Sequence, residues 1–351
     1  MDNEIYRAQR SALLITRAHL LWALRSFFHR EGFLEIESPI VVCSPGLEPQ
    51  LDAFEIIAHY AYHEVSEGAD ERRRLHTSPE YALKRYLGGE GSDVSRVYSI
   101  GSCFRDEHPS MSHSPEFTML EWYARDLSLE GLMTQCEELV ITLAKEAEQR
   151  AQLCQWWSSL LVEVREGEAI FDRLSVREAF LRYAEIDLND CQETEALREA
   201  ASRSGIRESA LYGDWDELYF QVFMDLVEPH LGLQRPTFLY DFPASQAALA
   251  KLDPDDTRWA RRFELFARGL ELANAFDELS NPIEQRARFL LDLEQRRIRG
   301  AQLPPIDEVL LTSLPLLGQC VGIALGFDRL IMSLCGVDDI NMVRLQPWRL
   351  P

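Results

Sequence analysis

The sequence predicts an α+β fold with an antiparallel sheet flanked by helices, on two observations. Strand-like segments pair as hairpins near both ends of the chain, residues 96–104 with 116–123, and the two segments on either side of Arg268-Gly269. Helical patterns fill the region between these hairpins. A doubly wound parallel sheet would instead alternate strands with helices along the chain.

The bulk composition limits the class of protein. The chain has 351 residues, 46% of them hydrophobic, which is enough for a large core. A net charge of −22 argues against extensive contact with nucleic-acid phosphates, because proteins that make such contacts usually carry a basic face. The sequence has no 18-residue apolar run and no secretory leader pattern, so we expect a cytoplasmic protein without a membrane span. Its seven cysteines never form a C-x-x-C pair, which predicts reduced thiols and no zinc site.

Hydrophobic periodicity predicts the elements of the first half of the chain. Residues 5–31 repeat apolar side chains at the helical period, and residues 32–42 then extend. A polar loop separates the strands at 96–104 and 116–123, as in an antiparallel hairpin. Residues 129–144 carry another apolar helical stripe.

The second half of the chain contains further signals. Ser175 and Glu178 have the spacing of a capping box, which predicts the start of a helix. Residues 236–243 have a strand pattern and residues 283–299 a charged helical pattern. Residues 320–336 indicate a glycine-containing strand that runs into a helix.

The common glycine-rich nucleotide cradles are absent from the sequence. It contains neither G-x-x-x-x-G-K-[ST] nor G-x-G-x-x-G, and H-E-x-x-H and G-x-S-x-G are missing as well. If this protein binds a nucleotide, other side chains must hold the phosphates.

Two arginines are candidates for that task. Arg105 and Glu107 follow the strand at 96–104, and residues two apart on a strand point the same way. The guanidinium fork suits phosphate or carboxylate, and the acid suits an amino group or magnesium. A solvated ion pair is the alternative. Arg329 follows Asp328 at a helix start, where a cation suits a bound phosphate, although these two residues alone favour a solvated arginine beside an Asp N-cap.

Acidic side chains form the second group of candidates. Glu271, Asn274 and Glu278 lie on a mostly apolar strand, where unpaired carboxylates are costly to bury. They indicate magnesium ligation and recognition of a cationic substrate, or else an edge strand with one solvated face. Glu80 in "TSPEYALKR" either contacts a ligand or caps a helix.

Taken together, these segments resemble the class II aminoacyl-tRNA synthetases. "FRDEHPSMSHSPEF" is similar to motif 2, "GFDRL" to motif 3, and residues 12–39 with Pro39 to motif 1. "TSPEYALKR", "PEFTMLEWY" and "ELANAFDEL" resemble the lysyl-tRNA synthetase branch. The resemblance implies one class II catalytic domain over residues 1–351, with a helical insertion at about 127–235.

The chain starts almost at motif 1, so we expect no anticodon-binding domain. It therefore resembles the elongation factor P–(R)-β-lysine ligases, stand-alone paralogues of lysyl-tRNA synthetase. That family implies activation of (R)-β-lysine or lysine by ATP and magnesium, as an acyl-adenylate, and transfer to a lysine of elongation factor P. No zinc or organic cofactor is expected. Motif 1 implies a homodimer, and extensive tRNA binding is not expected.

The resemblance also assigns roles to individual residues. The residues expected to bind ATP are Arg105, Glu107, Ser114, Phe117, Glu271, Leu272, Asn274, Gly326 and Arg329, and those expected to bind the substrate are Ser78, Glu80, Tyr123, Glu278 and Ala324. Arg105, Arg329 and Glu271 are the expected catalytic residues, with Glu271 holding the magnesium. Tyr123 and Glu278 are expected to take the distal ammonium group.

The remaining roles make the hairpin an ATP clamp. Phe117 and Arg329 are expected on the two faces of the adenine, with Glu107 at its amino group. Ser78 and Glu80 are expected at the substrate amino group beside the reacting carboxyl.

Three positions depart from the usual pattern of these families. Ser114 replaces a longer Asn, and Asp277 stands where His is common. Ala324 interrupts the glycine pattern of motif 3, a change that the ligase family shares. We hypothesise that its methyl group lies against the substrate backbone and favours a β-amino acid over α-lysine.

Other functions stay open at this point. One is a truncated lysine-activating enzyme that charges a tRNA or another amine. Another is a catalytically silent paralogue that binds an amino acid, against which the intact Arg105 and Arg329 argue. An ammonia-using asparagine synthetase is disfavoured by Glu278 and Tyr123, which suit a cationic side chain.

Overall fold

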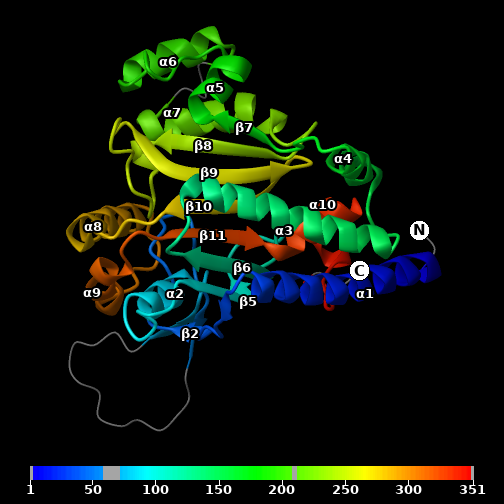
Figure 1. Ribbon diagram of the computed structural model, residues 1–351. Coiled ribbons are helices and arrows are strands. Elements are labelled where there is room, and N and C mark those ends of the chain that lie inside the picture. Colours follow the sequence, from blue (N-terminus) through cyan, green and yellow to red (C-terminus); the bar gives the residue numbers. More distant parts are fainter. Residues whose placement is uncertain (1–2, 58–71, 208–211, 349–351) are drawn as a thin grey trace. The chain divides into compact units, whose positions relative to one another are not determined.

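The computed structural model describes residues 3–57, 72–207 and 212–348, and the chain forms two compact units (Figure 1). Unit 1 comprises Met1–Gln155 and Glu278–Pro351, and unit 2 comprises Trp156–Asp277. Each unit contains β-strands together with helices, which confirms the α+β class. None of the helices in the described ranges is long and apolar enough to cross a bilayer.

The sheet of unit 1 contains the first predicted hairpin. Its strands, in spatial order, are β1 (Leu34–Glu35), β5 (Arg96–Phe104), β6 (Glu116–Ala124) and β11 (Val321–Gly326). β6 pairs antiparallel with β5, as predicted, and also with β11, whereas β1 pairs parallel to β5. A small second sheet has the order β2 (Val41–Val42), β4 (Arg73–Leu75) and β3 (Glu55–Ile56).

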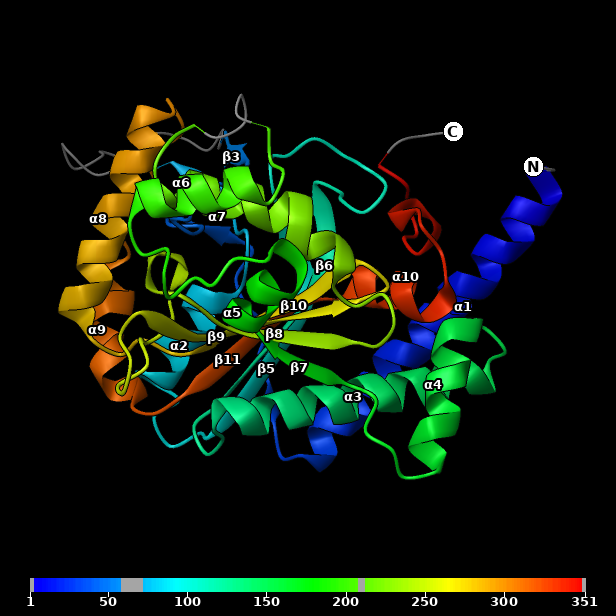
Figure 2. The same ribbon diagram turned by 90° about the horizontal axis from the view of Figure 1, so that it is seen from above.

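Two long helices cover one face of this hairpin. α1 (Asn3–Arg30) confirms the first predicted helix, and α3 (Leu129–Gln149) packs against it, so that the two cross in Figure 2. The buried ring of Phe28 stacks on Tyr98 with centroids 4.5 Å apart. Trp122 lies edge-on to Phe28 at 5.4 Å and donates its indole N–H to Gln135 of α3 (3.0 Å). The aromatic side chains of β5 and β6 therefore anchor both helices.

The other helices of unit 1 are α2 (Glu80–Leu87), α8 (Pro282–Ile298), α9 (Glu308–Leu317) and α10 (Phe327–Cys335), followed by a short 3₁₀ turn (Ile340–Met342). α9 packs against both α2 and α8. Asn281 caps α8 by accepting from the backbone N–H of Ile283 (3.0 Å), and Pro282 follows it at the first helical position. The predicted strand that runs into a helix is confirmed by β11 and α10.

A buried arginine fixes the loop between the small strands of unit 1. Arg296 of α8 is 1% exposed and donates to the carbonyl oxygens of Glu48 (2.8 Å) and Leu51 (2.7 Å). The same guanidinium binds the carboxylate of Asp52 at 2.7 Å. The carbonyl oxygen of Asp52 accepts from the N–H of Asp106 (2.8 Å), which ties this loop to the end of β5.

The sheet of unit 2 contains the second predicted hairpin. Its strands, in order, are β10 (Leu270–Asp277), β9 (Trp259–Ala267), β8 (Thr237–Pro243) and β7 (Asp172–Ser175). β9 pairs antiparallel with β10 and β8, and β7 is parallel to β8. Arg268 and Gly269 form the turn with φ of 54° and 70°, as a two-residue hairpin of right-handed twist requires.

Short helices make up the rest of unit 2. They are α4 (Gln155–Arg165), α5 (Val176–Ala179), α6 (Thr194–Arg203) and α7 (Trp215–Val222), with π-helical turns at Phe180–Ala184 and Phe223–Val227 and 3₁₀ turns at Glu228–His230 and Ala244–Gln246. The Ser175–Glu178 capping box is confirmed. Phe180 and Tyr219 stack in the core with centroids 5.0 Å apart. The helices α3 to α7 fall within the proposed insertion, whose place in a single domain stays a prediction.

Removing the Phe28 ring should lower the free energy of unfolding by about 3–5 kcal/mol, because a fully buried ring leaves a cavity between its aromatic neighbours. Urea denaturation of Phe28→Ala measures this loss. The control Leu291→Ala removes a side chain that is 65% exposed in the same unit, and should change stability by less than about 0.5 kcal/mol. Equal losses in the two variants would contradict the packing described here.

Candidate active site

One face of the sheet in unit 1 collects several of the predicted side chains. Phe117, Glu121 and Tyr123 alternate along β6 and therefore point to the same face. Residues directly opposite on paired strands share a face, and Ala324 of β11 lies opposite Glu121. Gly326 follows two residues later on the same face. The register therefore aligns the expected adenine-binding ring with the expected substrate-binding residues.

The two predicted arginines approach the same acid. The guanidinium of Arg105 lies 5.0 Å from the ring centroid of Phe117, and its Nε is shielded from solvent with no hydrogen-bond partner among the described residues. Burial raises the pKa of Glu107, and the charges of Arg105 and Arg329 oppose that rise. Arg105, Glu107 and Arg329 thus form one group at the end of the hairpin.

His113 is a member of this group that the sequence reasoning missed. Arg329 donates Nε to the carbonyl of Ser112 (3.2 Å), and its Nη2 lies 2.7 Å from His113 Nε2. Burial, with the charges of Arg329 and Arg105, lowers the pKa of His113 to about 4. A neutral imidazole can accept from the guanidinium, while its Nδ1 lies 3.0 Å from Ser110 Oγ. The loop after β5 is therefore held against α10.

Ser114 lies in the same loop, as predicted for an ATP contact. Its side chain is 1% exposed, and its hydroxyl has no hydrogen-bond partner among the described residues. Buried polar groups normally have a partner, so this hydroxyl is free to meet a ligand. The contact with ATP itself stays a prediction.

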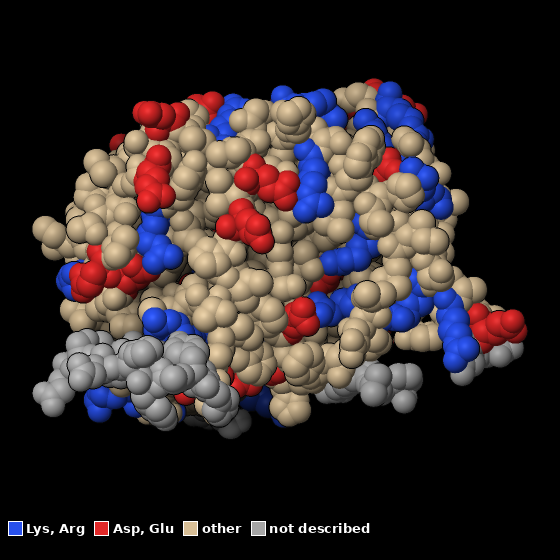
Figure 3. All heavy atoms as spheres, turned by 90° about the horizontal axis from the view of Figure 1, so that it is seen from below, with Lys and Arg blue, Asp and Glu red and all other residues tan. Residues whose placement is uncertain are grey.

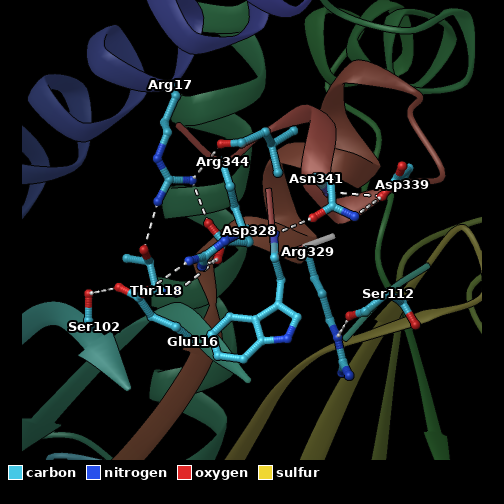
Figure 4. A network of polar contacts seen from close by, with 12 residues as sticks. Arg17, Ser102, Ser112, Glu116, Thr118, Asp328, Arg329, Asp339, Asn341 and Arg344 are labelled. Atoms are coloured by element: carbon cyan, nitrogen blue, oxygen red, sulfur yellow. Dashed lines mark hydrogen bonds and ion pairs between the residues drawn. The ribbon is translucent and has the colours of Figure 1, made fainter. Parts of the chain in front are cut away.

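A buried carboxylate positions the residues beside the clamp (Figure 4). Asp328 is 2% exposed and accepts from Arg17 of α1 (2.5 Å), from the backbone N–H of Thr118 (2.8 Å) and from Arg344 (3.3 Å). Phe117, which precedes Thr118, and Arg329, which follows Asp328, are the two residues expected on the faces of the adenine. The alternative that Asp328 is the helix N-cap is wrong, because Gly326 occupies that position.

An internal cation lies at the expected substrate end of the site. Lys84 of α2 is 3% exposed and forms ion pairs with Glu80 and with Glu278, which is fully buried. Burial lowers the pKa of Lys84, but the charges of Glu278 and Glu80 outweigh it and raise the pKa above its ordinary value. Two carboxylates expected to bind ammonium groups are therefore held by one lysine, which the sequence reasoning missed.

Tyr123 and Glu278 meet beside Gly322, as the prediction of a joint ammonium site requires. A Cβ atom at Gly322 would overlap the Tyr123 ring and Glu278 Oε1. The Nζ atom of Lys84 lies 6.0 Å from the centroid of the same ring. Only glycine leaves room for both side chains at this point of β11.

Glu121 is a further acid of this face that the sequence reasoning missed. It is fully buried and accepts from Ser78 Oγ (2.6 Å) and from the Tyr123 hydroxyl (3.2 Å). Burial, with the charge of Glu80, raises the pKa of Glu121 to about 8. An acid in the middle of the apolar run "TMLEWY" is costly to bury, and that cost was a usable signal.

The remaining predicted residues lie in unit 2, where a β-bulge arranges them. Glu271 is opposite Phe266 and Asn274 is opposite Glu264, with the extra residue at Leu272. Because Phe266 and Glu264 share a face, Glu271 and Asn274 also share one, although they are three residues apart. The regular alternation of a strand would have placed them on opposite faces.

This face of unit 2 offers oxygen ligands. Asn274 Oδ1 accepts from Arg262 Nε (3.0 Å), and Arg262 is ion-paired with Glu264. Burial raises the pKa of Glu264 to about 7, with Arg262 opposing the rise and Glu271 adding to it. Carboxylate and amide oxygens fit magnesium. Over the described ranges, no group of three or more His, Cys, Asp or Glu side chains is placed to hold a metal ion.

The structure accounts for Asp277, which departs from the family pattern. Its carboxylate accepts from Lys251 Nζ (2.8 Å) and Arg261 Nε (3.1 Å), both in unit 2. The extra acid is therefore paired within its own unit. The approach of Glu271, Leu272 and Asn274 to the arginines of unit 1 stays a prediction.

Comparison with known proteins gives one consistent result. The family model described as tRNA synthetases class II (D, K and N) matches residues 3–349. The chain is 39% identical over 336 residues to a protein of Proteus mirabilis named elongation factor P–(R)-β-lysine ligase, which covers 95% of this chain and 94% of the relative. Proteins of the same name from Photorhabdus laumondii and Salmonella typhi are each 37% identical, over 95% and 93% of this chain and 94% and 92% of their own lengths.

Glu121 should make the stability of the protein fall as the pH rises. Its folded pKa of about 8 lies above the ordinary value of 4.5, so the stability that its bound proton contributes is complete below about pH 4.5 and declines as the pH rises towards about 8. Glu121→Gln should therefore show a smaller decline in Tm between about pH 5 and pH 8. Exposed Glu90→Gln is the control, and a wild-type slope in Glu121→Gln would rule out this assignment.

Proposed function

The chain belongs to the family of class II tRNA synthetases (D, K and N), and we propose that it is an ATP-dependent ligase that activates (R)-β-lysine and joins it to elongation factor P. The observation that carries this proposal is the sheet face in unit 1. A pair of arginines lies at one end of it, and carboxylates that suit ammonium groups lie at the other. The names of relatives 37–39% identical to the chain support the substrate and the acceptor.

The first step forms an acyl-adenylate. The substrate carboxylate is ionised at pH 7, so it can attack the α-phosphorus of ATP without a general base. A carboxyl O–P bond forms and the bond to pyrophosphate breaks. Arg105 and Arg329 neutralise the charge that develops on the phosphoryl oxygens and hold the reactants in line. Arg105 binds both the α-phosphate and the carboxylate.

Magnesium belongs to this step, and the donor set of unit 2 fits it. Glu271 would hold the ion with Asn274 nearby, since the bulge turns both to one face. The bound ion supplies charge neutralisation on the phosphates. The approach of these residues to Arg105 is part of the proposal.

The second step transfers the acyl group to the protein acceptor. A lysine amine of elongation factor P attacks the carbonyl carbon of the mixed anhydride. A C–N bond forms, the bond to the AMP oxygen breaks, and the amine loses a proton to give the amide. A tRNA hydroxyl is the competing acceptor. On the face shown in Figure 3, Lys and Arg side chains are interspersed with Asp and Glu, which does not favour a long nucleic-acid track.

The substrate is selected by the carboxylates at the far end of the site. Ser78 and Glu80 contact the amino group beside the reacting carboxyl, and Tyr123 and Glu278 contact the terminal ammonium. The methyl group of Ala324, opposite Glu121, narrows the space at the substrate backbone. This arrangement favours a diamino acid.

Assembly and location complete the proposal. Three large apolar side chains of α1 are exposed, Ile5 at 61%, Ile15 at 58% and Trp22 at 68%. They support a homodimer through this helix, as motif 1 implies. The protein acts in the cytoplasm, where elongation factor P functions.

Arg105→Ala should abolish ATP–pyrophosphate exchange with (R)-β-lysine, with a loss in rate of at least about 100-fold. The variant lacks the guanidinium that stabilises the negative charge developing on the phosphoryl oxygens in the transition state. Exchange measured with radiolabelled pyrophosphate tests this. Arg30→Ala, which removes an exposed arginine from α1, is the control. Near-normal exchange in Arg105→Ala would exclude the proposed role. Wild-type protein that exchanges with neither (R)-β-lysine nor α-lysine would exclude the function.

Glu278→Gln should raise the KM for (R)-β-lysine by at least about 30-fold, because removing a desolvated charge partner costs about 2–5 kcal/mol. The KM for ATP should stay within about threefold, since the change lies at the substrate end. Steady-state exchange assays with each substrate varied in turn measure both constants. An unchanged KM for the diamino acid would remove Glu278 from the ammonium site.

A further inference from the structure

The loop of residues 44–52 connects the two ends of the proposed site. At one end, the hydroxyl and backbone N–H of Thr77, which precedes Ser78, both donate to the carbonyl of Pro45 (2.8 and 3.4 Å). At the other end, the carbonyl of Asp52 accepts from Asp106, which follows Arg105. Buried Arg296 holds the loop between these points. The backbone of this loop is therefore fixed at both ends of the proposed site.

Glu48 lies in the middle of this loop and turns its carboxylate inward. A Cβ atom on Gly46 would lie 2.5 Å from Glu48 Oε2 and 3.0 Å from Thr77 Oγ1, so these two oxygens approach the same point. Oε2 is shielded from solvent and has no hydrogen-bond partner among the described residues. The absence of a side chain at Gly46 leaves the carboxylate its space.

The electrostatic surroundings of Glu48 are those of the proposed site. Burial and the charge of Glu80 raise its pKa, and the charges of Arg105 and Lys84 oppose that rise. Lys84 is already paired with Glu80 and Glu278. A buried carboxylate oxygen without a donor is destabilising, and a bound ammonium group would supply the missing donor.

The geometry points to Glu48 as a specificity-determining residue whose carboxylate binds the ammonium group nearest the reacting carboxyl of the substrate. This inference rests on the proposed function, in which Arg105 holds that carboxyl and Glu80 meets the same ammonium. We call the ammonium group nearest the reacting carboxyl the inner ammonium. Glu48 and Glu80 then both bind the inner ammonium, and Glu278 binds the terminal ammonium. An amino acid without the inner amine leaves Glu48 unpaired and binds less well.

The test separates the two ammonium groups by using analogues that lack one of them. The wild type and Glu48→Gln are assayed by pyrophosphate exchange with (R)-β-lysine, with 6-aminohexanoate, which lacks the inner amine, and with 3-aminohexanoate, which lacks the terminal amine. Each analogue is also measured as a competitive inhibitor. We expect the preference for (R)-β-lysine over 6-aminohexanoate to fall at least about 10-fold in Glu48→Gln, because the charge partner of the inner amine is lost. The preference over 3-aminohexanoate and the KM for ATP should stay within about threefold.

Two further variants make the outcome decisive. Exposed Glu37→Gln changes the net charge equally and should behave as wild type. Glu48→Asp keeps the charge and should retain part of the preference for the inner amine, and it replaces Glu48→Gln if that variant does not fold. An unchanged preference, or a rise confined to the KM for ATP, would overturn the inference while leaving the proposed function intact. A wild type that activates and binds neither diamino acid would overturn both.

Discussion

The carboxylate of Asp328 is the point on which the architecture of unit 1 depends. It is buried and joins α1, β6 and the segment after α10 through Arg17, the N–H of Thr118 and Arg344. Two guanidinium groups and one amide compensate its desolvation, and removing one member would leave a buried charge unpaired. This carboxylate joins β6 to α10. It therefore holds Phe117, which precedes Thr118 in β6, at a fixed separation from Arg329, which follows Asp328 in α10. The helix α1 is thereby coupled to the proposed nucleotide end of the site.

The same unit concentrates negative charge around one lysine. Four carboxylates, those of Glu48, Glu80, Glu121 and Glu278, surround Lys84 or act on its neighbours. A raised pKa keeps Glu121 largely protonated near neutral pH, which limits the repulsion in the absence of a ligand. A substrate with two ammonium groups and one carboxylate would supply net positive charge to this end. In the proposed function, this charge balance favours a substrate with two ammonium groups.

Much of the fold followed from the sequence because it depends on local patterns. The apolar periods and turn residues located both hairpins, α1 and the β11–α10 segment, and the motif residues Arg105 and Arg329 met as expected. The missed residues depend on contacts between distant segments. Lys84 lies on a helix, and the local sequence shows only that a charged residue stands there. Its two ion-pair partners, Glu80 and Glu278, are 4 and 194 positions away in sequence. His113 acquires its role from Arg329, 216 residues later, and no window of sequence contains both.

The bulge at Leu272 has a consequence for how this strand can change. Regular pleating at the present length of β10 would place the carboxylate of Glu271 and the amide of Asn274 on opposite sides, because they are three positions apart. Removing Leu272 alone would leave them two positions apart and on the same side. Segments exchanged between relatives must therefore either keep the bulge between these two residues or lack only that one residue.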